Sequence, residues 1–243
     1  MSATRLDKYL SLSGERSRSE ATKLIRSGQV TVDGKPVCDP SAKVAEGAQV
    51  LLRGQPVTDS TWQYYLLYKP SGVLTAARDD RAATVMDLLP PALAHRKVLP
   101  VGRLDKDTTG LLLLTNDGPL AHSLIDPKRH VWKTYIAHVE GRLTAEDEAA
   151  FAAGMTLSDF TAKPAQMRIL QAEDQQSVAR VELREGKYHQ VKRMFSARGH
   201  EVLQLHRSAF GPITLPDDAQ PGFYRELTAR EVSALKEAVT HQS

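Results

Sequence analysis

The stretch of residues 102–118 holds the densest group of chemically capable side chains in this 243-residue chain. Its sequence, GRLDKDTTGLLLLTNDG, places Asp105 and Asp107 beside the cations of Arg103 and Lys106, ahead of four consecutive leucines. The leucines predict a buried strand, and a charged loop that feeds such a strand is a favoured place for functional groups. A carboxylate there can act as a general base or a nucleophile, although a single aspartate in a glycine-rich loop is more often a turn or capping residue.

A calcium site is the first alternative for this loop. Asp105, Asp107 and Gly110 partly match the spacing of an EF-hand. The fifth position is Thr109 and the twelfth is Asn116, where that loop needs a bidentate glutamate. No flanking helices fit either, so the sequence argues against a calcium loop.

Composition narrows the class of protein further. Charged residues make up 25% and hydrophobic ones 41%, which is typical of a globular chain. No stretch of about 18 apolar residues predicts a membrane span, and the charged N-terminus lacks the apolar core of a signal peptide. Cys38 is the only cysteine, which excludes an internal disulfide and a cysteine-based zinc cluster. No P-loop or Rossmann glycine pattern is present. We therefore expect a cytoplasmic protein.

Positive charge is concentrated near the N-terminus. The net charge of +3 equals the excess of six basic over three acidic side chains within residues 1–26. Such a cluster can contact a phosphate backbone, and it can also be an ordinary solvated helix face. The six basic residues are Arg5, Lys8, Arg16, Arg18, Lys23 and Arg26.

Residues 1–53 predict a compact helix–helix–hairpin unit. Apolar spacing indicates a helix over 5–12, and the pair Ser17 and Glu20 forms a capping box for a second helix that ends at Gly28. An alternating strand follows, with Asp-Gly as its hairpin turn. A polar link at 54–61 then separates this unit from the rest of the chain.

Residues 62–243 predict a larger unit in which strands outnumber helices. We expect strands over 64–68, 110–115, 134–139, 167–170, 178–183 and 202–205. We expect helices over 84–89, 144–151 and 188–198, and a terminal helix after a capping box at Thr228. Short connections favour an α+β fold with a largely antiparallel sheet and flanking helices.

Two resemblances cover nearly the whole chain. The order of RLDKYL, SRSEA and the GQVTVDG hairpin resembles the S4 RNA-binding domain. The loop at 102–118 resembles the signature of the pseudouridine synthases of the RsuA/RluA superfamily. The segments KPSG at 69–72, KTY at 133–135 and GKYHQVKRMF at 186–195 fit that family as well. An S4 domain followed by this catalytic domain points to the RsuA-type branch.

The resemblance implies a role for each of four residues. Asp105 matches the family's catalytic aspartate, and Tyr135 matches the tyrosine that lies against the target uracil. Lys192 matches the basic partner of the aspartate, and Arg103 matches the arginine that displaces the base. From the residues alone, a strand tyrosine such as Tyr135 is more often a core side chain. Lys192 can be a solvated helix lysine, and Arg103 can equally pair with Asp107 or contact a phosphate. The spacing of His189, Lys192, Arg193 and Ser196 also places these polar side chains on one helix face.

The same resemblance implies the reaction and the partner. We expect an isomerase that needs no metal and no organic cofactor, and that acts as a monomer on ribosomal RNA or an assembly intermediate. The Asp-Thr-Thr-Gly sequence, residues 205–207 and the short C-terminal end are most similar to synthases of pseudouridine 516 in 16S rRNA. The alternatives are the same reaction on a 23S rRNA stem-loop and a non-catalytic RNA-binding assembly factor. An S4-bearing aminoacyl-tRNA synthetase is excluded, because its ATP-binding signatures are missing.

Overall fold

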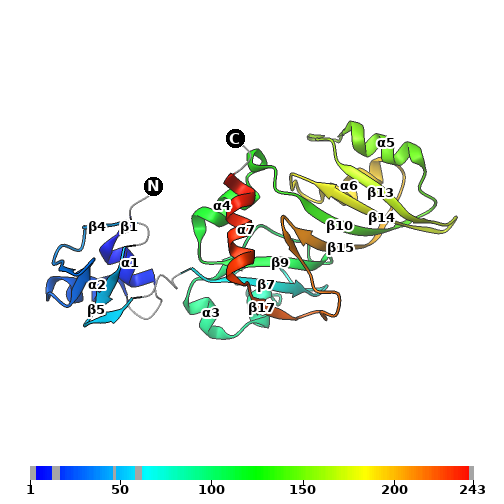
Figure 1. Cartoon of the computed structure of the whole chain (residues 1–243). Helices are drawn as coiled ribbons and strands as arrows, with labels where there is room; N and C mark the ends of the chain where they lie inside the picture. Colours follow the sequence, from blue (N-terminus) through cyan, green and yellow to red (C-terminus); the bar gives the residue numbers. More distant parts are fainter. Residues whose placement is uncertain (1–3, 13–16, 46–47, 58–61, 241–243) are drawn as a thin grey trace. The chain divides into compact units, whose positions relative to one another are not determined.

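The computed structural model divides into two compact units (Figure 1). It describes residues 4–12, 17–45, 48–57 and 62–240. One unit comprises the chain up to Gln63 together with Ala92–Val98, and the other comprises Tyr64–Pro91 and the chain from Leu99 onward. The predicted domain limits stay predictions, because residues 58–61 of the link lie outside the described part. Among the described residues, no helix is both long and apolar enough to span a membrane.

The first unit packs two helices against short strands. Its elements are β1 (Thr4–Arg5), α1 (Leu6–Leu12), α2 (Arg18–Arg26), β2 (Val30–Val32), β3 (Lys35–Pro36), β4 (Lys43–Val44), β5 (Val50–Leu52) and β6 (Gln55–Pro56). Leu6, Leu10 and Ile25 are fully buried in its core. The predicted capping box is present, since Ser17 and Glu20 exchange side-chain and backbone hydrogen bonds at the start of α2.

The second unit is built on one nine-stranded sheet. Its strands are β7 (Tyr64–Lys69), β8 (Leu99–Pro100), β9 (Thr109–Thr115), β10 (Lys133–Glu140), β13 (Gln166–Ala172), β14 (Gln176–Leu183), β15 (Val202–Phe210), β16 (Ile213–Thr214) and β17 (Tyr224–Glu226). The order along the sheet is β13-β14-β10-β15-β9-β7-β17, and every pair except β9–β15 is antiparallel. The predicted α+β fold with a largely antiparallel sheet is confirmed.

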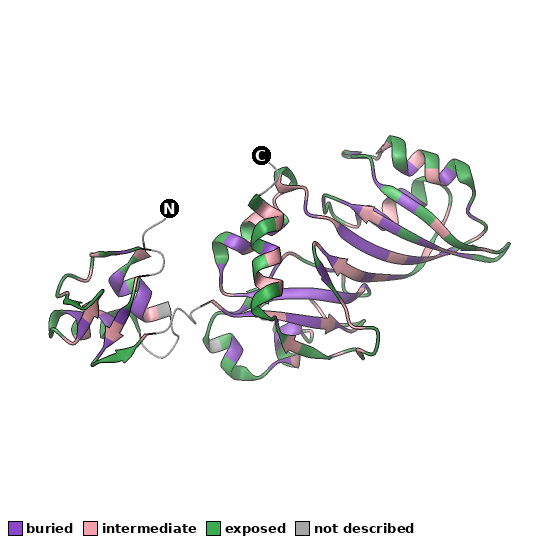
Figure 2. Cartoon of the chain, viewed as in Figure 1, coloured by how far each residue is buried: buried purple, intermediate pink, exposed green. Residues whose placement is uncertain are grey.

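Helices cover this sheet at both ends. They are α4 (Gly118–Ile125), α5 (Ala145–Ala153), α6 (Gln190–Ala197) and α7 (Ala229–Thr240), with short 3₁₀ helices η1 (Val85–Leu88) and η2 (Pro127–Arg129) and a small hairpin of β11 (Met155–Thr156) and β12 (Thr161–Ala162). Helix α3 (Pro91–His95) belongs, from Ala92 onward, to the first unit. Helices α5 and α6 lie near β13 and β14 (Figure 1). Phe151 of α5 and Phe195 of α6 are fully buried, with ring centroids 4.8 Å apart. Figure 2 shows buried residues concentrated in the strands and exposed ones on the outer helix surfaces.

Three helical features differ from the sequence predictions. Helices α3 and α4 were not predicted, because Pro90-Pro91 and Asn116-Asp117-Gly118 read as breaks. In the structure Pro91 is the first residue of α3, and Asp117 caps α4 by accepting the backbone N–H of Leu120 at 3.0 Å. Helix α6 starts at Gln190 rather than Tyr188, since His189 adopts a left-handed backbone with φ of 50°.

Candidate active site

The loop between β8 and β9 is fixed by a buried lysine. Lys69, at the end of β7, is fully buried, and its ammonium donates hydrogen bonds to the carbonyls of Pro70, Lys106 and Thr108 at 2.9–3.0 Å. Burial lowers the pKa of Lys69 to about 8, which still leaves it mainly charged at neutral pH. A charged donor shared by three carbonyls holds the loop's backbone in one conformation.

Two further contacts fix the ends of this loop. The Thr75 hydroxyl donates to the carbonyl of Leu104 at 2.8 Å and accepts its N–H at 3.2 Å. Gly110 has φ of 106°, and a Cβ there would overlap the backbone of Arg207. Glycine is therefore needed where β9 runs parallel to β15. The side chain of Asp105 is carried on a backbone that is held on both sides.

Asp105 opens into a small pocket between this loop, β10 and the start of α6. The pocket is lined by Arg103, Asp105, Thr108, Tyr135, His189 and Gln190, among others. The side chain of Asp105 is 26% exposed, so its carboxylate is shielded but reachable. Three of the four predicted site residues thus share this pocket.

The predicted basic residue, Lys192, lies between two carboxylates. Its ammonium is 2.6 Å from both oxygens of Asp107 and 3.9 Å from Oδ2 of Asp105. The hydrogen bond from Lys192 lowers the pKa of Asp107 below its ordinary value. The direct partner of Lys192 in this structure is therefore Asp107, and Asp105 is its more distant neighbour.

His189 is the site residue that the sequence interpretation missed. Its Nε2 is 3.4 Å from Oδ1 of Asp105, nearer than the ammonium of Lys192. The expected helix over 188–198 placed His189 on a polar face without locating it at the site. The available signal was its position in the GKYHQVKRMF segment, three residues before Lys192.

Tyr135 and Arg103 differ in their surroundings. Tyr135 lies on β10 between Val181 of β14 and Arg207 of β15, and it is only 9% exposed. Arg103 is exposed, and among the described residues it forms no hydrogen bond or ion pair. Of the two alternatives for Arg103, the ion pair with Asp107 is not formed. A guanidinium at the rim of a pocket remains available to a ligand.

The described members of the six predicted RNA contacts fall into two groups. Arg5 and Arg18 both donate to the buried carboxylate of Asp7, at 2.9–3.3 Å. The hydrogen bond from Arg5 lowers the pKa of Asp7 to about 2, so these two cations partly serve the fold.

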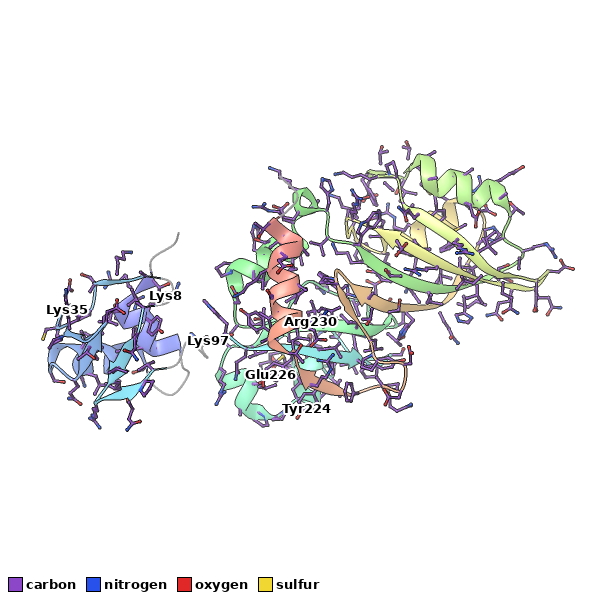
Figure 3. The ribbon with its side chains drawn as sticks, viewed as in Figure 1. Lys8, Lys35, Lys97, Tyr224, Glu226 and Arg230 are labelled. Atoms are coloured by element: carbon purple, nitrogen blue, oxygen red, sulfur yellow. The ribbon has the colours of Figure 1, made fainter. Side chains whose placement is uncertain are left out.

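The other three cations have no such partner. Lys8, Lys23 and Arg26 are exposed without an ion pair in the described ranges, and Figure 3 shows Lys8 at the surface of this unit. Arg16, the sixth predicted RNA contact, lies outside the described residues. Of the predicted RNA contacts, these three are therefore available to a phosphate backbone.

The site combines the shielded carboxylate of Asp105 with the imidazole of His189 and the ammonium of Lys192. The buried Tyr135 and the exposed guanidinium of Arg103 complete it. Such a set can perform proton transfer or nucleophilic attack on a bound polar substrate. No cluster of three or more histidine, cysteine, aspartate or glutamate side chains suited to a metal ion occurs among the described residues.

Comparison with protein families gives two matches. Residues 63–197 match the family described as RNA pseudouridylate synthase, and residues 4–50 match the S4 domain. The first match spans more than half of the chain and contains Arg103, Asp105, Tyr135, His189 and Lys192.

Relatives of known sequence match over nearly their whole length. An uncharacterised RNA pseudouridine synthase, YtzG, of Bacillus subtilis is 43% identical, covering 96% of this chain and 98% of its own. Ribosomal small subunit pseudouridine synthase A of Yersinia pestis is 38% identical, covering 95% and 97%. Ribosomal large subunit pseudouridine synthase B of Bacillus subtilis is also 38% identical, covering 98% and 97%.

A solved structure agrees with these matches. A crystal structure of a pseudouridylate synthase is 35% identical with a TM-score of 0.66, covering 95% of this chain and 99% of its own. The chain therefore belongs to the RNA pseudouridylate synthase family, and it carries an S4 domain ahead of that family's catalytic region.

Proposed function

We propose that this protein isomerises one uridine of 16S rRNA to pseudouridine, with Asp105 as the catalytic carboxylate. One observation carries the assignment of Asp105. Asp105 lines one pocket together with Tyr135. The Nε2 of His189 and the ammonium of Lys192 lie 3.4 and 3.9 Å from the carboxylate oxygens of Asp105. No other carboxylate lines this pocket among the described residues.

The reaction conserves every atom of the nucleotide. The N1–C1′ bond breaks, the uracil turns while still bound, and C5 bonds to C1′. N1 takes up a proton and C5 releases one to solvent, so no oxidant, reductant or energy source enters the balance. The Asp105 carboxylate serves this by one of two routes. It attacks C1′ and is displaced by C5, or it removes the C2′ proton and returns it.

Each neighbour of Asp105 has a part in this proposal. Lys192 supplies the positive charge that lies between the Asp105 and Asp107 carboxylates and balances them. The ring of Tyr135 lies against the uracil, where stacking on a base contributes roughly 1–3 kcal/mol. Arg103 enters the space that the extruded base leaves and offsets part of the cost of unstacking.

The choice of 16S rRNA rests on sequence motifs. Small-subunit and large-subunit relatives are equally identical to this chain, at 38%. The Asp-Thr-Thr-Gly loop and residues 205–207 favour the small-subunit enzymes. The large-subunit relative keeps a 23S rRNA stem-loop as the second candidate. A non-catalytic assembly factor is disfavoured, because Asp105, Tyr135 and Lys192 are all present.

Transcribed rRNA separates the two targets. Unmodified 16S and 23S transcripts are labelled with tritium at C5 of uridine. The tritium is released only when C5 bonds to C1′. We expect about one equivalent of tritium per 16S transcript and none from 23S. Tritium release from the 23S transcript alone would make 23S rRNA the target in place of 16S rRNA. If neither transcript released tritium, and small-subunit assembly intermediates did not either, the enzyme assignment would be contradicted.

We also propose that the first unit holds RNA through the unpaired cations Lys8, Lys23 and Arg26. Arg5 and Arg18 add to this surface, although Asp7 engages both. Arg16 completes the predicted set. With an RNA partner we place the protein in the cytoplasm, as a monomer.

Removing the three unpaired charges is expected to weaken RNA binding. The triple variant Lys8→Gln, Lys23→Gln, Arg26→Gln should lower the slope of log affinity against log salt by about 2–3, since each lost phosphate contact removes roughly 0.7–0.9. Filter binding of the 16S transcript at several salt concentrations measures it. Lys236→Gln, on the exposed side of α7, is the matched control. A salt slope equal to that of the wild type would contradict the proposal that these three side chains contact RNA.

A further inference from the structure

Tyr188 is the most exposed large hydrophobic side chain among the described residues, at 75%. Its ring stacks on the imidazole of His189, with centroids 3.8 Å and planes 18° apart. His189 covers one face of the tyrosine ring, and the exposure leaves the other face open to solvent. An aromatic ring with one open face is a surface on which a nucleobase can stack.

The loop that carries Tyr188 is held by a buried amide. Gln190 is 4% exposed; its Oε1 accepts the N–H of Lys187 at 3.0 Å and its Nε2 donates to Glu185 at 2.6 Å. Glu185, also buried, accepts the N–H of Lys163 at 2.8 Å. Both sides of the Tyr188–His189 pair are therefore fixed, which lowers the entropy cost of binding a ligand there.

The backbone of the pair is constrained as well. His189 holds φ of 50°, a conformation that is uncommon for residues other than glycine and that often marks functional sites. Arg193 donates to the carbonyl of Tyr188 at 3.5 Å, pairs with Asp159 and lies over the ring of Phe160 at 4.9 Å. These contacts hold the aromatic pair directly before the first turn of α6.

The same pair connects the open ring to the catalytic carboxylate. The imidazole that stacks on Tyr188 places its Nε2 3.4 Å from Asp105. Lys187 and His189, on either side of Tyr188, both line the pocket that contains Asp105. Tyr188 therefore stands at the rim of this pocket, within reach of the nucleotides next to one whose base enters it.

We propose that the open face of Tyr188 stacks on an unpaired base adjacent to the target uridine, which makes Tyr188 a substrate-positioning residue. The inference rests on the proposed function, because it requires that Asp105 act on a uridine within RNA. Stacking on Tyr188 selects for an unpaired base, since a base inside a helix has both faces covered by its stacked neighbours. It thereby favours target uridines whose neighbour is unstacked.

Kinetics on the 16S transcript, or on the 23S transcript if that is the substrate, test the role. Tyr188→Ala is expected to raise KM on the order of tenfold while kcat stays within about twofold. Tyr188→Phe keeps the ring and should match the wild type. Tyr188→Leu keeps apolar bulk without a ring and should resemble the alanine variant. The high exposure of Tyr188 means that all three variants should fold, which circular dichroism checks.

Two kinetic outcomes would overturn the inference. A loss of kcat with unchanged KM in Tyr188→Ala would show that Tyr188 only holds His189 against Asp105. A leucine variant equal to the wild type would show that apolar cover, not stacking, is what matters.

A binding measurement separates this inference from the proposed function. Stacking tolerates any base, so a single-stranded 12-mer of uridine is a suitable probe for the full chain. We expect Tyr188→Ala to weaken binding of this probe on the order of tenfold and Tyr188→Phe to leave it unchanged. Equal affinity for wild type and Tyr188→Ala would contradict the stacking role, whether or not the protein isomerises uridine. An inactive wild type with this difference intact would instead count against the proposed function alone.

Discussion

Replacing Asp105 with asparagine is expected to lower kcat for pseudouridine formation on the order of 10³-fold or more. The amide keeps the size of the carboxylate but lacks the charge needed to attack C1′ or to take the C2′ proton. Asp105 is held by a loop whose backbone is bonded to Lys69 and Thr75, so the substitution leaves the pocket in place. RNA affinity should therefore persist.

Tritium release from C5-labelled 16S transcript under single-turnover conditions measures this loss, and filter binding measures the affinity. Asp174→Asn is the matched control, because that carboxylate is 89% exposed and contacts only the exposed Arg142 among the described residues. Its rate should equal that of the wild type. If Asp105→Asn kept more than a tenth of the wild-type rate, Asp105 could not be the catalytic group.

Replacing Lys192 with methionine is the second large effect, an expected loss of kcat on the order of 10²-fold. Its ammonium is the cation shared by Asp105 and Asp107, at 3.9 and 2.6 Å. Without it, two carboxylates on one short loop lose their common partner, and the pKa of Asp107 rises toward its ordinary value. Asp105 then also lacks the nearby positive charge that balances its carboxylate in the pocket while it reacts.

The fold should tolerate this change. Asp107 is 69% exposed, and surface ion pairs contribute about 0–1 kcal/mol, so the melting temperature should hardly move. Lys192→Arg keeps the charge and should recover part of the rate, whereas Lys236→Met should leave it unchanged. A Lys192→Met enzyme within threefold of the wild type would show that the Lys192 charge is not required.

Local sequence patterns predicted most of the fold. The capping boxes at Ser17 and Thr228 are formed, and the predicted strand pair over 167–183 is the antiparallel pair β13–β14. These features depend on residues a few positions apart or on simple alternation. Helix α4 was not predicted, because its capping residue Asp117 belongs to a sequence that equally forms a turn.

The site was harder to predict, because it is assembled from distant parts of the chain. Lys69 meets the carbonyl of Lys106 across 37 residues, and no local pattern marks a buried lysine at the end of a strand. Lys192 meets Asp107 across 85 residues. His189 was missed since its left-handed backbone moves it out of the expected helix and toward Asp105. The resemblance to a known family identified Asp105, Tyr135, Lys192 and Arg103 as site residues. The geometry of the structure added His189 to this set.

Mapping pseudouridine in cellular rRNA tests the central claim most directly. Sequencing after pseudouridine-specific chemical labelling would compare 16S and 23S rRNA from cells with the gene, without it, and with the Asp105→Asn allele at equal protein level. We predict that one pseudouridine in 16S rRNA disappears without the gene, returns with the wild type and stays absent with Asp105→Asn. If cells without the gene kept every pseudouridine of 16S rRNA, or if the Asp105→Asn allele restored the missing one, the proposed function would be contradicted.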